Sequence, residues 1–212
     1  MPISLARTLS LAFLLAVTTA SAQDRSFLVG TTKVSFQPLH SANEKYGCSL
    51  AYMSAALDFA TLKGLPVMVV GNIFFSVNRA QKAPGLSLKI AVSDYESPDP
   101  KPFAPHFAYL QSANGSTLKS KFQELPADEE GFKIFVFALD GQSTKLLGDL
   151  LDGQQPINVG FRRKQGGMDV LVPVDLTVAS TELKDGKLLR TKSDAAITNF
   201  RKCFSDVAKL LN

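Results

Sequence analysis

The sequence predicts a mainly β protein, an antiparallel β-sandwich-like domain with one short internal helix and a C-terminal helix. Segments rich in Val, Ile and Phe recur along the chain, and several alternate apolar with polar residues, which is the period of a half-buried strand. Apolar residues at helical spacing mark one short internal segment and the last segment of the chain. A two-sheet sandwich is the most economical way to bury so many branched and aromatic side chains.

The first half of the chain predicts four strands. Residues 33–39 form the first, and 65–79 form a long strand in which Gly71 is a candidate β-bulge. Residues 48–62 fit helical and strand spacing equally well, and the β character of the following segments favours a strand. A fourth strand begins at residue 86, and its core-facing side chains are Leu86, Leu88, Ile90 and Val92.

A proline-rich segment, "SPDPKPFAP" at 97–105, excludes a helix and a central strand, so we expect an exposed, stiff connection. A proline-rich recognition ligand is the alternative. Next, 106–113 and 116–125 flank Asn114-Gly115, a pair that favours a hairpin with a type I′ turn.

The second half predicts a strand at 132–141, a short helix capped by Ser143 and ended by Gly153, and a hairpin within 156–180. Ser193 is the expected cap of the terminal helix. The apolar residues that line one face of that helix are Ile197, Phe200, Phe204, Val207 and Leu211.

The N-terminus has the three parts of a secretory signal. Arg7 precedes a short apolar run at 9–17, and Ala20-Ser21-Ala22 supplies small residues for signal peptidase. The run is shorter than the roughly 20 residues of a membrane-spanning helix. We therefore predict that residues 1–22 are cleaved, that 23–212 form a single β-rich domain, and that the protein is periplasmic or extracellular. A retained N-terminal anchor is the alternative.

The chain has two cysteines, Cys48 and Cys203, far apart in the sequence. Thiols exported to an oxidising compartment usually pair, and closing so long a loop restricts the unfolded chain by about 4–5 kcal/mol. We expect a disulfide that ties the start of the domain to its last helix. Two buried free thiols, or one reactive cysteine, remain as alternatives.

No motif predicts a catalytic, cofactor-binding or metal-binding residue. His40 and His106 lack metal-ligand spacing, no G-x-S-x-G or phosphate-binding glycine loop is present, and the acidic cluster 127–131 fits an exposed turn. A net charge of +4, which includes Arg7, is too mild to indicate nucleic acid as a partner.

Four residues are candidates for an interaction surface. Phe74 and Phe75 are consecutive in a predicted strand, so one of them faces away from the core and must meet a second layer, a partner or solvent. Arg162 and Arg163 belong to the densest basic run, beside a predicted turn at 165–167. A solvated hairpin tip is favoured there over a polyanion site.

Two segments carry a resemblance to a known family. A strand, short-helix and strand run, "FVFALDGQSTKLLGDLLDGQQPINVGF" at 135–161, precedes a closing helix that starts at "SDAAITNFRKC". Over 132–204 the chain resembles small exported alphaproteobacterial proteins of the invasion-associated locus B family. It departs from them in lacking a tryptophan-plus-cysteine entry segment and in an apparent insertion at 180–192. The resemblance implies a non-catalytic periplasmic or surface-exposed β protein linked to envelope integrity or host contact, and it transfers no functional residue.

We therefore expect an exported, non-catalytic binding or structural protein of the bacterial envelope, without a cofactor and without a transmembrane segment after signal cleavage. Its partner would be an unidentified protein or envelope component. Two alternatives stay open: a secreted hydrolase with His106 or His40 as base, and an inhibitor or immunity-type protein that blocks a partner with the 97–105 loop.

Overall fold

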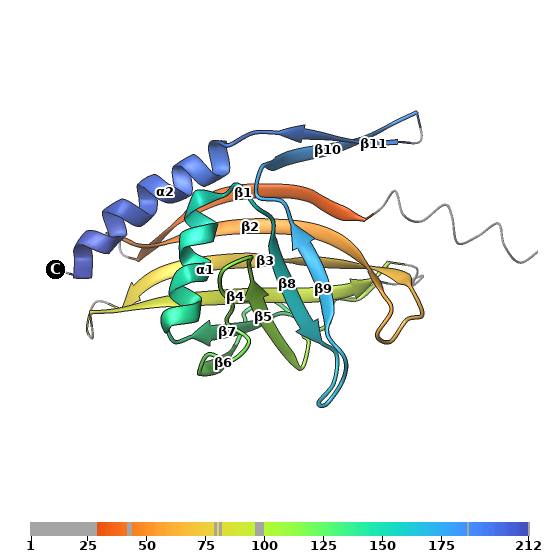
Figure 1. Cartoon of the computed structure of the whole chain (residues 1–212), viewed down its shortest axis with the longest axis horizontal. Coiled ribbons are helices and arrows are strands. Elements are labelled where there is room, and N and C mark those ends of the chain that lie inside the picture. Colours follow the sequence, from red (N-terminus) through yellow and green to blue (C-terminus); the bar gives the residue numbers. More distant parts are fainter. Residues whose placement is uncertain are drawn as a thin grey trace, which may run out of the picture.

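A six-stranded antiparallel sheet packs against a second layer, which consists of a three-stranded sheet and two helices (Figure 1). The computed structural model describes residues 29–41, 44–78, 80, 82–95, 100–185 and 187–211. The predicted signal peptide lies outside these residues. The mainly β, sandwich-like fold with one short internal and one C-terminal helix is confirmed.

The strands and helices have the following bounds. The large sheet has the spatial order β1 (Gly30–Ser41), β2 (Glu44–Asp58), β3 (Leu65–Asn78), β4 (Ala83–Asp94), β7 (Lys133–Phe137) and β6 (Phe122–Pro126). The smaller sheet has the order β5 (Phe107–Gln111), β8 (Ile157–Arg162) and β9 (Val170–Val174). A separate hairpin pairs β10 (Val178–Lys184) with β11 (Lys187–Lys192), and the helices are α1 (Gly141–Asp152) and α2 (Ala195–Ala208).

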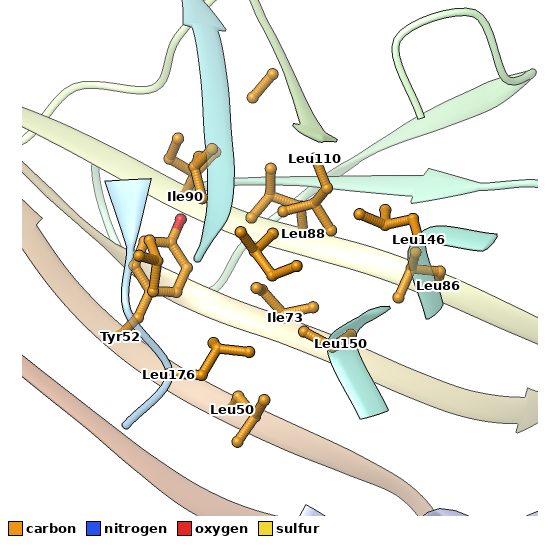
Figure 2. Close-up of a cluster of buried hydrophobic side chains, with 14 of the residues drawn as sticks. Leu50, Tyr52, Ile73, Leu86, Leu88, Ile90, Leu110, Leu146, Leu150 and Leu176 are labelled. Carbon is orange, nitrogen blue, oxygen red and sulfur yellow. The ribbon is translucent and has the colours of Figure 1, made fainter. Parts of the chain in front are cut away.

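The core lies between the two layers, and alternation along the long strands builds it. Leu50 of β2 is opposite Ile73 of β3, which is opposite Leu88 of β4, and all three are fully buried. Leu110 of β5 and Leu146 of α1 come from the second layer to meet them (Figure 2). Because each such side chain contributes about 1.5–3 kcal/mol when fully buried, this cluster is the main source of cohesion between the layers.

The ambiguous segment 48–62 is a strand as far as Asp58, but the bulge predicted at Gly71 is wrong. Gly71 pairs with Tyr52 on one side and Ile90 on the other, without a shift in register. Glycine is required there because a Cβ would lie 2.0 Å from the Lys89 carbonyl oxygen and 2.9 Å from the Tyr52 hydroxyl. That hydroxyl is buried and has no hydrogen-bond partner among the described residues.

The predicted type I′ hairpin at Asn114-Gly115 is also wrong. A tight turn does form, since the Ser112 N–H donates to the Gly115 carbonyl at 2.8 Å, but neither central residue has positive φ. After Ser116 the chain leaves β5, and its next strand, β6, pairs with β7 in the other sheet. Packing against α1, and not the local turn preference, decides the backbone here. Helix α1 lies so close that a Cβ on Gly115 would be 2.3 Å from the Gln142 carbonyl oxygen.

Helix α1 begins one turn earlier than its predicted cap, Ser143. Asp140 is the N-cap, and its carboxylate accepts the backbone N–H groups of Gln142 and Ser143, both at 2.9 Å. Ser143 returns the contact by accepting the Asp140 N–H at 2.7 Å, which completes a capping box. Hydrogen bonds from Ser143 and its neighbours hold the Asp140 pKa at about 2. The helix ends at Gly153 in the left-handed conformation, as predicted.

Helix α2, by contrast, begins one residue later than its predicted cap, Ser193, implies. Its N-cap is Asp194, which makes no side-chain capping bond, and Ser193 instead accepts the Ala195 N–H at 3.2 Å. The predicted apolar face is correct in its main members, since Ile197, Phe200 and Val207 are all buried.

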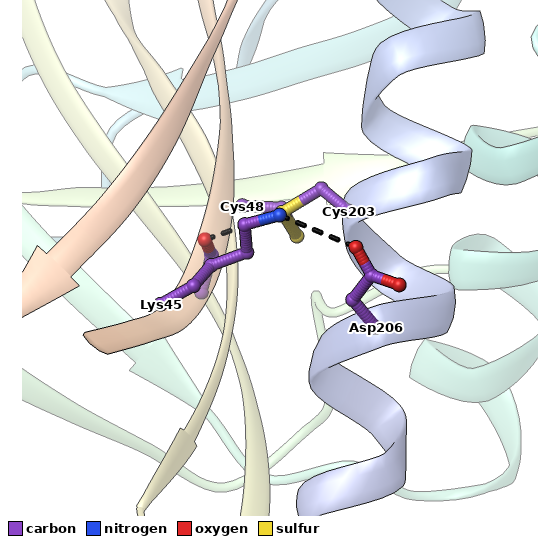
Figure 3. The surroundings of a disulfide bond; sticks show 5 residues. Lys45, Cys48, Cys203 and Asp206 are labelled. Atoms are coloured by element: carbon purple, nitrogen blue, oxygen red, sulfur yellow. Dashed lines mark hydrogen bonds and ion pairs between the residues drawn. A yellow bond between two sulfur atoms is a disulfide. The ribbon is translucent and has the colours of Figure 1, made fainter. Parts of the chain in front are cut away.

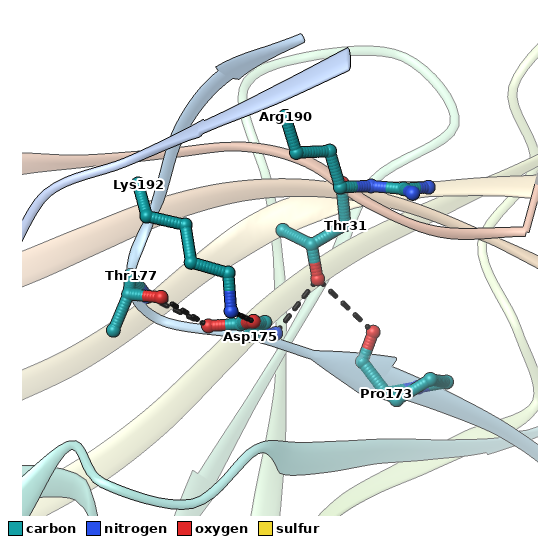
Figure 4. Close-up of polar contacts among 6 residues, drawn as sticks. All are labelled: Thr31, Pro173, Asp175, Thr177, Arg190 and Lys192. Atoms are coloured by element: carbon teal, nitrogen blue, oxygen red, sulfur yellow. Dashed lines mark hydrogen bonds and ion pairs between the residues drawn. The ribbon is translucent and has the colours of Figure 1, made fainter. Parts of the chain in front are cut away.

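Residues 180–185 and 187–192 belong to the β10–β11 hairpin, which lies beside β1. The Arg190 guanidinium donates to the carbonyls of Val29 and Thr31, both at 2.7 Å. The Thr31 hydroxyl in turn accepts the Asp175 N–H at 2.7 Å, while Lys192 pairs with the Asp175 carboxylate at 2.9 Å (Figure 4). The hairpin is therefore tied to β1 and to the end of β9 by charge-assisted hydrogen bonds.

Cys48 of β2 and Cys203 of α2 form the predicted disulfide, with an S–S distance of 2.02 Å and Cα atoms 5.9 Å apart (Figure 3). Beside it, Lys45 and Asp206 make an exposed ion pair at 3.3 Å. Bonds of this kind are typical of exported proteins. The disulfide fixes α2 across the inner face of the first strands of the sheet.

Candidate functional site

The outer face of the six-stranded sheet, which points away from the second layer, carries a groove of about 830 Å³. Strands β3, β4 and β7 form its floor, β6 forms one wall, and Leu39 and Tyr46 close the opposite side. The apolar and small side chains facing it include Phe74, Ser76, Ser87, Leu125, Ile134 and Val136.

The groove arises from alternating large and small residues on neighbouring strands. Phe74 of β3 is directly opposite Ser49 of β2 and Ser87 of β4, and Ser76 is opposite Gly85. Small side chains next to Phe74 leave a hollow that the aromatic ring and the β7 side chains border. An apolar, partly open floor on the solvent face of an antiparallel sheet is a feature of a binding surface.

Few charges face the groove. The Lys89 ammonium pairs with the Glu129 carboxylate and lies 4.9 Å from the centre of the Phe132 ring. The hydrogen bond from Lys89 holds the pKa of Glu129 below its ordinary range. Lys121 at the β6 wall is exposed, and its ammonium makes no ion pair in the part of the chain that the structure describes. The groove thus offers an apolar floor, hydroxyl and amide groups, and one uncompensated positive charge.

A second hollow, of about 510 Å³, lies on the other side of β6. Phe122 and Glu124 face it, whereas Gln123 and Leu125 face the groove, because successive strand residues point to opposite faces. Its other lining residues include His106, Phe107, Lys119 and Arg162. Strand β6 is therefore a ridge between two depressions.

The two histidines lie in different parts of the molecule, and both are exposed. His106 is exposed at the second hollow, and His40 is exposed near the end of β1. Within the described ranges, no hydrogen bond or ion pair joins either imidazole to a serine or an aspartate, and no group of three His, Cys, Asp or Glu residues could hold a metal ion.

Arg162 lies at the end of β8 and is half-buried in a local network. Its guanidinium pairs with Asp169 across the β8–β9 hairpin and lies 5.6 Å from the centre of the Phe107 ring. The Tyr109 hydroxyl donates to the same carboxylate at 3.0 Å. Burial, followed by this hydrogen bond to Asp169, raises the pKa of Tyr109 to about 12.

Arg163 is more deeply buried and joins three segments of the chain. Its guanidinium donates to Asp58 at 2.7 Å and to Asp94 at 2.6 Å, and it lies 4.8 Å from the centre of the Phe103 ring. Phe103 also exchanges backbone hydrogen bonds with Val92 at 2.8 and 3.0 Å. The end of the proline-rich segment is thus docked against β4, and its residues 97–99 lie outside the described residues.

The four predicted interaction residues do not form one surface. Phe74 borders the groove, whereas Phe75 is buried with its ring centre 4.6 Å from that of Phe204. Arg162 borders the second hollow, and Arg163 is anchored near the far end of β4. Sequence reasoning missed the β7 contribution to the groove, although the alternation in "KIFVF" assigns Ile134 and Val136 to the face opposite the buried Phe135 and Phe137.

Comparisons with known proteins add no relative: no family model, no curated protein and no solved structure matches the chain. The described helices include none that is long and apolar enough to cross a membrane. The fold and the site define a mainly antiparallel β protein, closed by an internal disulfide, with an open apolar groove on its large sheet.

Proposed function

We propose that this chain is an exported, non-catalytic binding protein of the bacterial envelope, and that the groove on the large sheet holds its partner. One observation carries the proposal. Among the described residues, the groove is lined by apolar, hydroxyl and amide side chains with two lysines, and none of these lining residues carries a carboxylate, imidazole or thiol. Such a lining, mainly apolar with a few polar groups, suits the recognition of a partner segment.

Export is supported by the secretory pattern of residues 1–22 and by the disulfide between Cys48 and Cys203. The partner is an envelope component that presents an apolar segment to Phe74 and an acceptor or anionic group to Lys121. The resemblance of 132–204 to the invasion-associated locus B family is consistent with such a role.

Site-specific photocrosslinking tests the groove. A benzophenone amino acid replaces Phe74 in one variant and Phe59 in a matched control, since Phe59 is 72% exposed on the β2–β3 connection, away from the groove. After irradiation of intact cells, we expect a discrete adduct from position 74 and none from position 59. Equal adducts from both positions, or none from position 74, would contradict binding in the groove.

Intact-mass measurement tests export separately. Protein from the periplasmic fraction should have the mass of a chain that starts at Gln23 and should take up an alkylating agent only after reduction. An uncleaved chain, or thiols that react without reductant, would refute export while leaving the groove experiment interpretable.

A further inference from the structure

The two edge strands of the large sheet, β1 and β6, differ in how far other parts of the chain cover them. The β1 edge is covered along its first residues, where Arg190 donates to the Thr31 carbonyl and Thr181 to the Thr32 carbonyl from the β10–β11 hairpin. At the opposite edge, all five residues of β6 are exposed, and among the described residues this strand pairs with β7 alone. An uncovered edge strand presents unpaired backbone groups to another chain.

The phase of the β6–β7 ladder shows which backbone groups are free. The Ala138 N–H donates to the Lys121 carbonyl at 2.8 Å, and the register places these two residues opposite each other. In an antiparallel ladder, hydrogen-bonded pairs alternate with non-bonded pairs. The N–H and C=O groups of Phe122 and Glu124 therefore point away from β7, together with the carbonyl of Pro126, which has no N–H.

We propose that this edge pairs with β6 of a second copy of the chain, antiparallel and centred on Glu124. In that register the two Glu124 residues exchange both backbone hydrogen bonds, and each Phe122 N–H donates to the Pro126 carbonyl of the other copy. Every outward N–H on both strands gains an acceptor. Each Phe122 carbonyl stays without a donor, because Pro126 of the other copy has no N–H, so the strands share only the Glu124–Glu124 and Phe122–Pro126 bonds.

Charge supports a second copy over an unrelated strand. Lys119 and Lys121 precede β6 and make no ion pair in the described structure, while the exposed Asp128 and Glu130 follow it. Antiparallel pairing brings the lysines of each copy alongside the acidic residues of the other, twice per dimer. The opposed Glu124 carboxylates are the cost, and each is already 3.0 Å from the Lys133 ammonium of its own chain.

The pairing also changes the groove. Gln123 and Leu125 lie on the groove side of β6, so Gln123 of each copy would be opposite Leu125 of the other. The two grooves would then open on the same face of one continuous sheet and share a wall. Because a single strand pair buries less than a standard interface and surface ion pairs are screened by salt, we expect a weak, salt-sensitive dimer.

Analytical ultracentrifugation of the mature chain over a range of concentrations tests the pairing. Glu124→Pro removes the central outward N–H but no bond to β7, so the monomer keeps its sheet, which circular dichroism and thermal unfolding check. We expect an association constant lower by about tenfold or more. The matched control Glu124→Ala keeps the N–H and removes the opposed carboxylates, so it should associate at least as tightly as the wild type.

Charge exchange gives a second, independent readout. The variants K119E/K121E and D128K/E130K should each lose self-association at low salt, because like charges then face each other. Mixed together they should form a heterodimer, since every contact again joins opposite charges. A wild type that stays monomeric at all concentrations, a Glu124→Pro variant that associates normally, or two charge variants that fail to associate on mixing would each overturn the proposal. If the wild type proves monomeric, the β6 edge would remain available to a strand of a different protein.

Discussion

Replacement of Arg163 by methionine should be among the most damaging single changes in this protein. The Asp58 side chain is 0% exposed, and its carboxylate accepts the Arg163 guanidinium at 2.7 Å. The Thr61 N–H and hydroxyl also donate to it, at 2.8 and 2.6 Å. Removing one partner of a buried ion pair costs about 3–5 kcal/mol. Since the two Thr61 bonds remain, we expect the lower end, about 3 kcal/mol, with less than about 1 kcal/mol from the part-exposed Asp94.

Urea unfolding at neutral pH measures this loss of unfolding free energy. A matched arginine variant tests whether the loss depends on the buried partner. Arg162→Met removes a neighbouring arginine whose pair with Asp169 is about one third exposed, so we expect a loss of no more than about 1 kcal/mol. Equal losses in the two variants, or a loss below about 1 kcal/mol for Arg163→Met, would refute the argument that burial of Asp58 decides the effect.

The pH dependence has a definite sign. Burial raises the pKa of Asp58, but hydrogen bonds from Thr61 and Arg163 outweigh it, and the net pKa lies below its ordinary value. The ionised carboxylate therefore stabilises the fold above the unfolded pKa of about 3.9, and this contribution is lost as pH falls through the folded pKa. The difference between wild type and Arg163→Met should shrink on acidification, because the variant's uncompensated carboxyl group is protonated first. A difference that is constant or grows would contradict the linkage.

Three further predictions concern other buried groups. Replacing both Cys48 and Cys203 by alanine should lower the free energy of unfolding by about 2–5 kcal/mol, and no loss in urea unfolding would show that the cross-link constrains little. Tyr52→Phe should be neutral or stabilising by up to about 1 kcal/mol, because no described residue hydrogen-bonds the buried hydroxyl; a clear destabilisation would mean that the hydroxyl is hydrogen-bonded in solution. In ultraviolet pH titration, Tyr109 should ionise near 12, and Asp169→Asn should lower that pKa because the repelling carboxylate is gone; an unchanged pKa would assign the whole shift to burial.

The strands with strong alternation could be predicted because a single face of the sheet decides their pattern. Leu86, Leu88 and Ile90 alternate with polar or small residues, and all three are buried as expected. The N-cap residues of the helices could not be assigned to one position, because several neighbouring residues can accept the first backbone N–H groups. Asp140 and Ser143 both accept backbone N–H groups, so the sequence marks the helix start without distinguishing the N-cap from the third helical position.

Features that depend on distant segments could not be predicted. Asn114-Gly115 has the composition of a hairpin turn, but Asp149 of α1 accepts the Asn114 backbone and side-chain N–H groups at 3.1 and 2.8 Å, which draws the turn to the helix. The groove had only one sequence signal, Phe74 beside Phe75. Its other walls depend on which strands become neighbours, and local alternation does not give that order.

The position of the last helix constrains when the chain can finish folding. Helix α2 covers the inner side of the first strands through the bond to Cys48 and the Phe75–Phe204 contact, yet it follows every strand in the sequence. Neither the Cys48–Cys203 bond nor the Phe75–Phe204 contact can form before the last residues of the chain are present. Completion of the fold is consequently a late event. A chain truncated before α2 would expose the apolar side chains that α2 covers, including Phe75, and exposed apolar surface of this kind promotes aggregation.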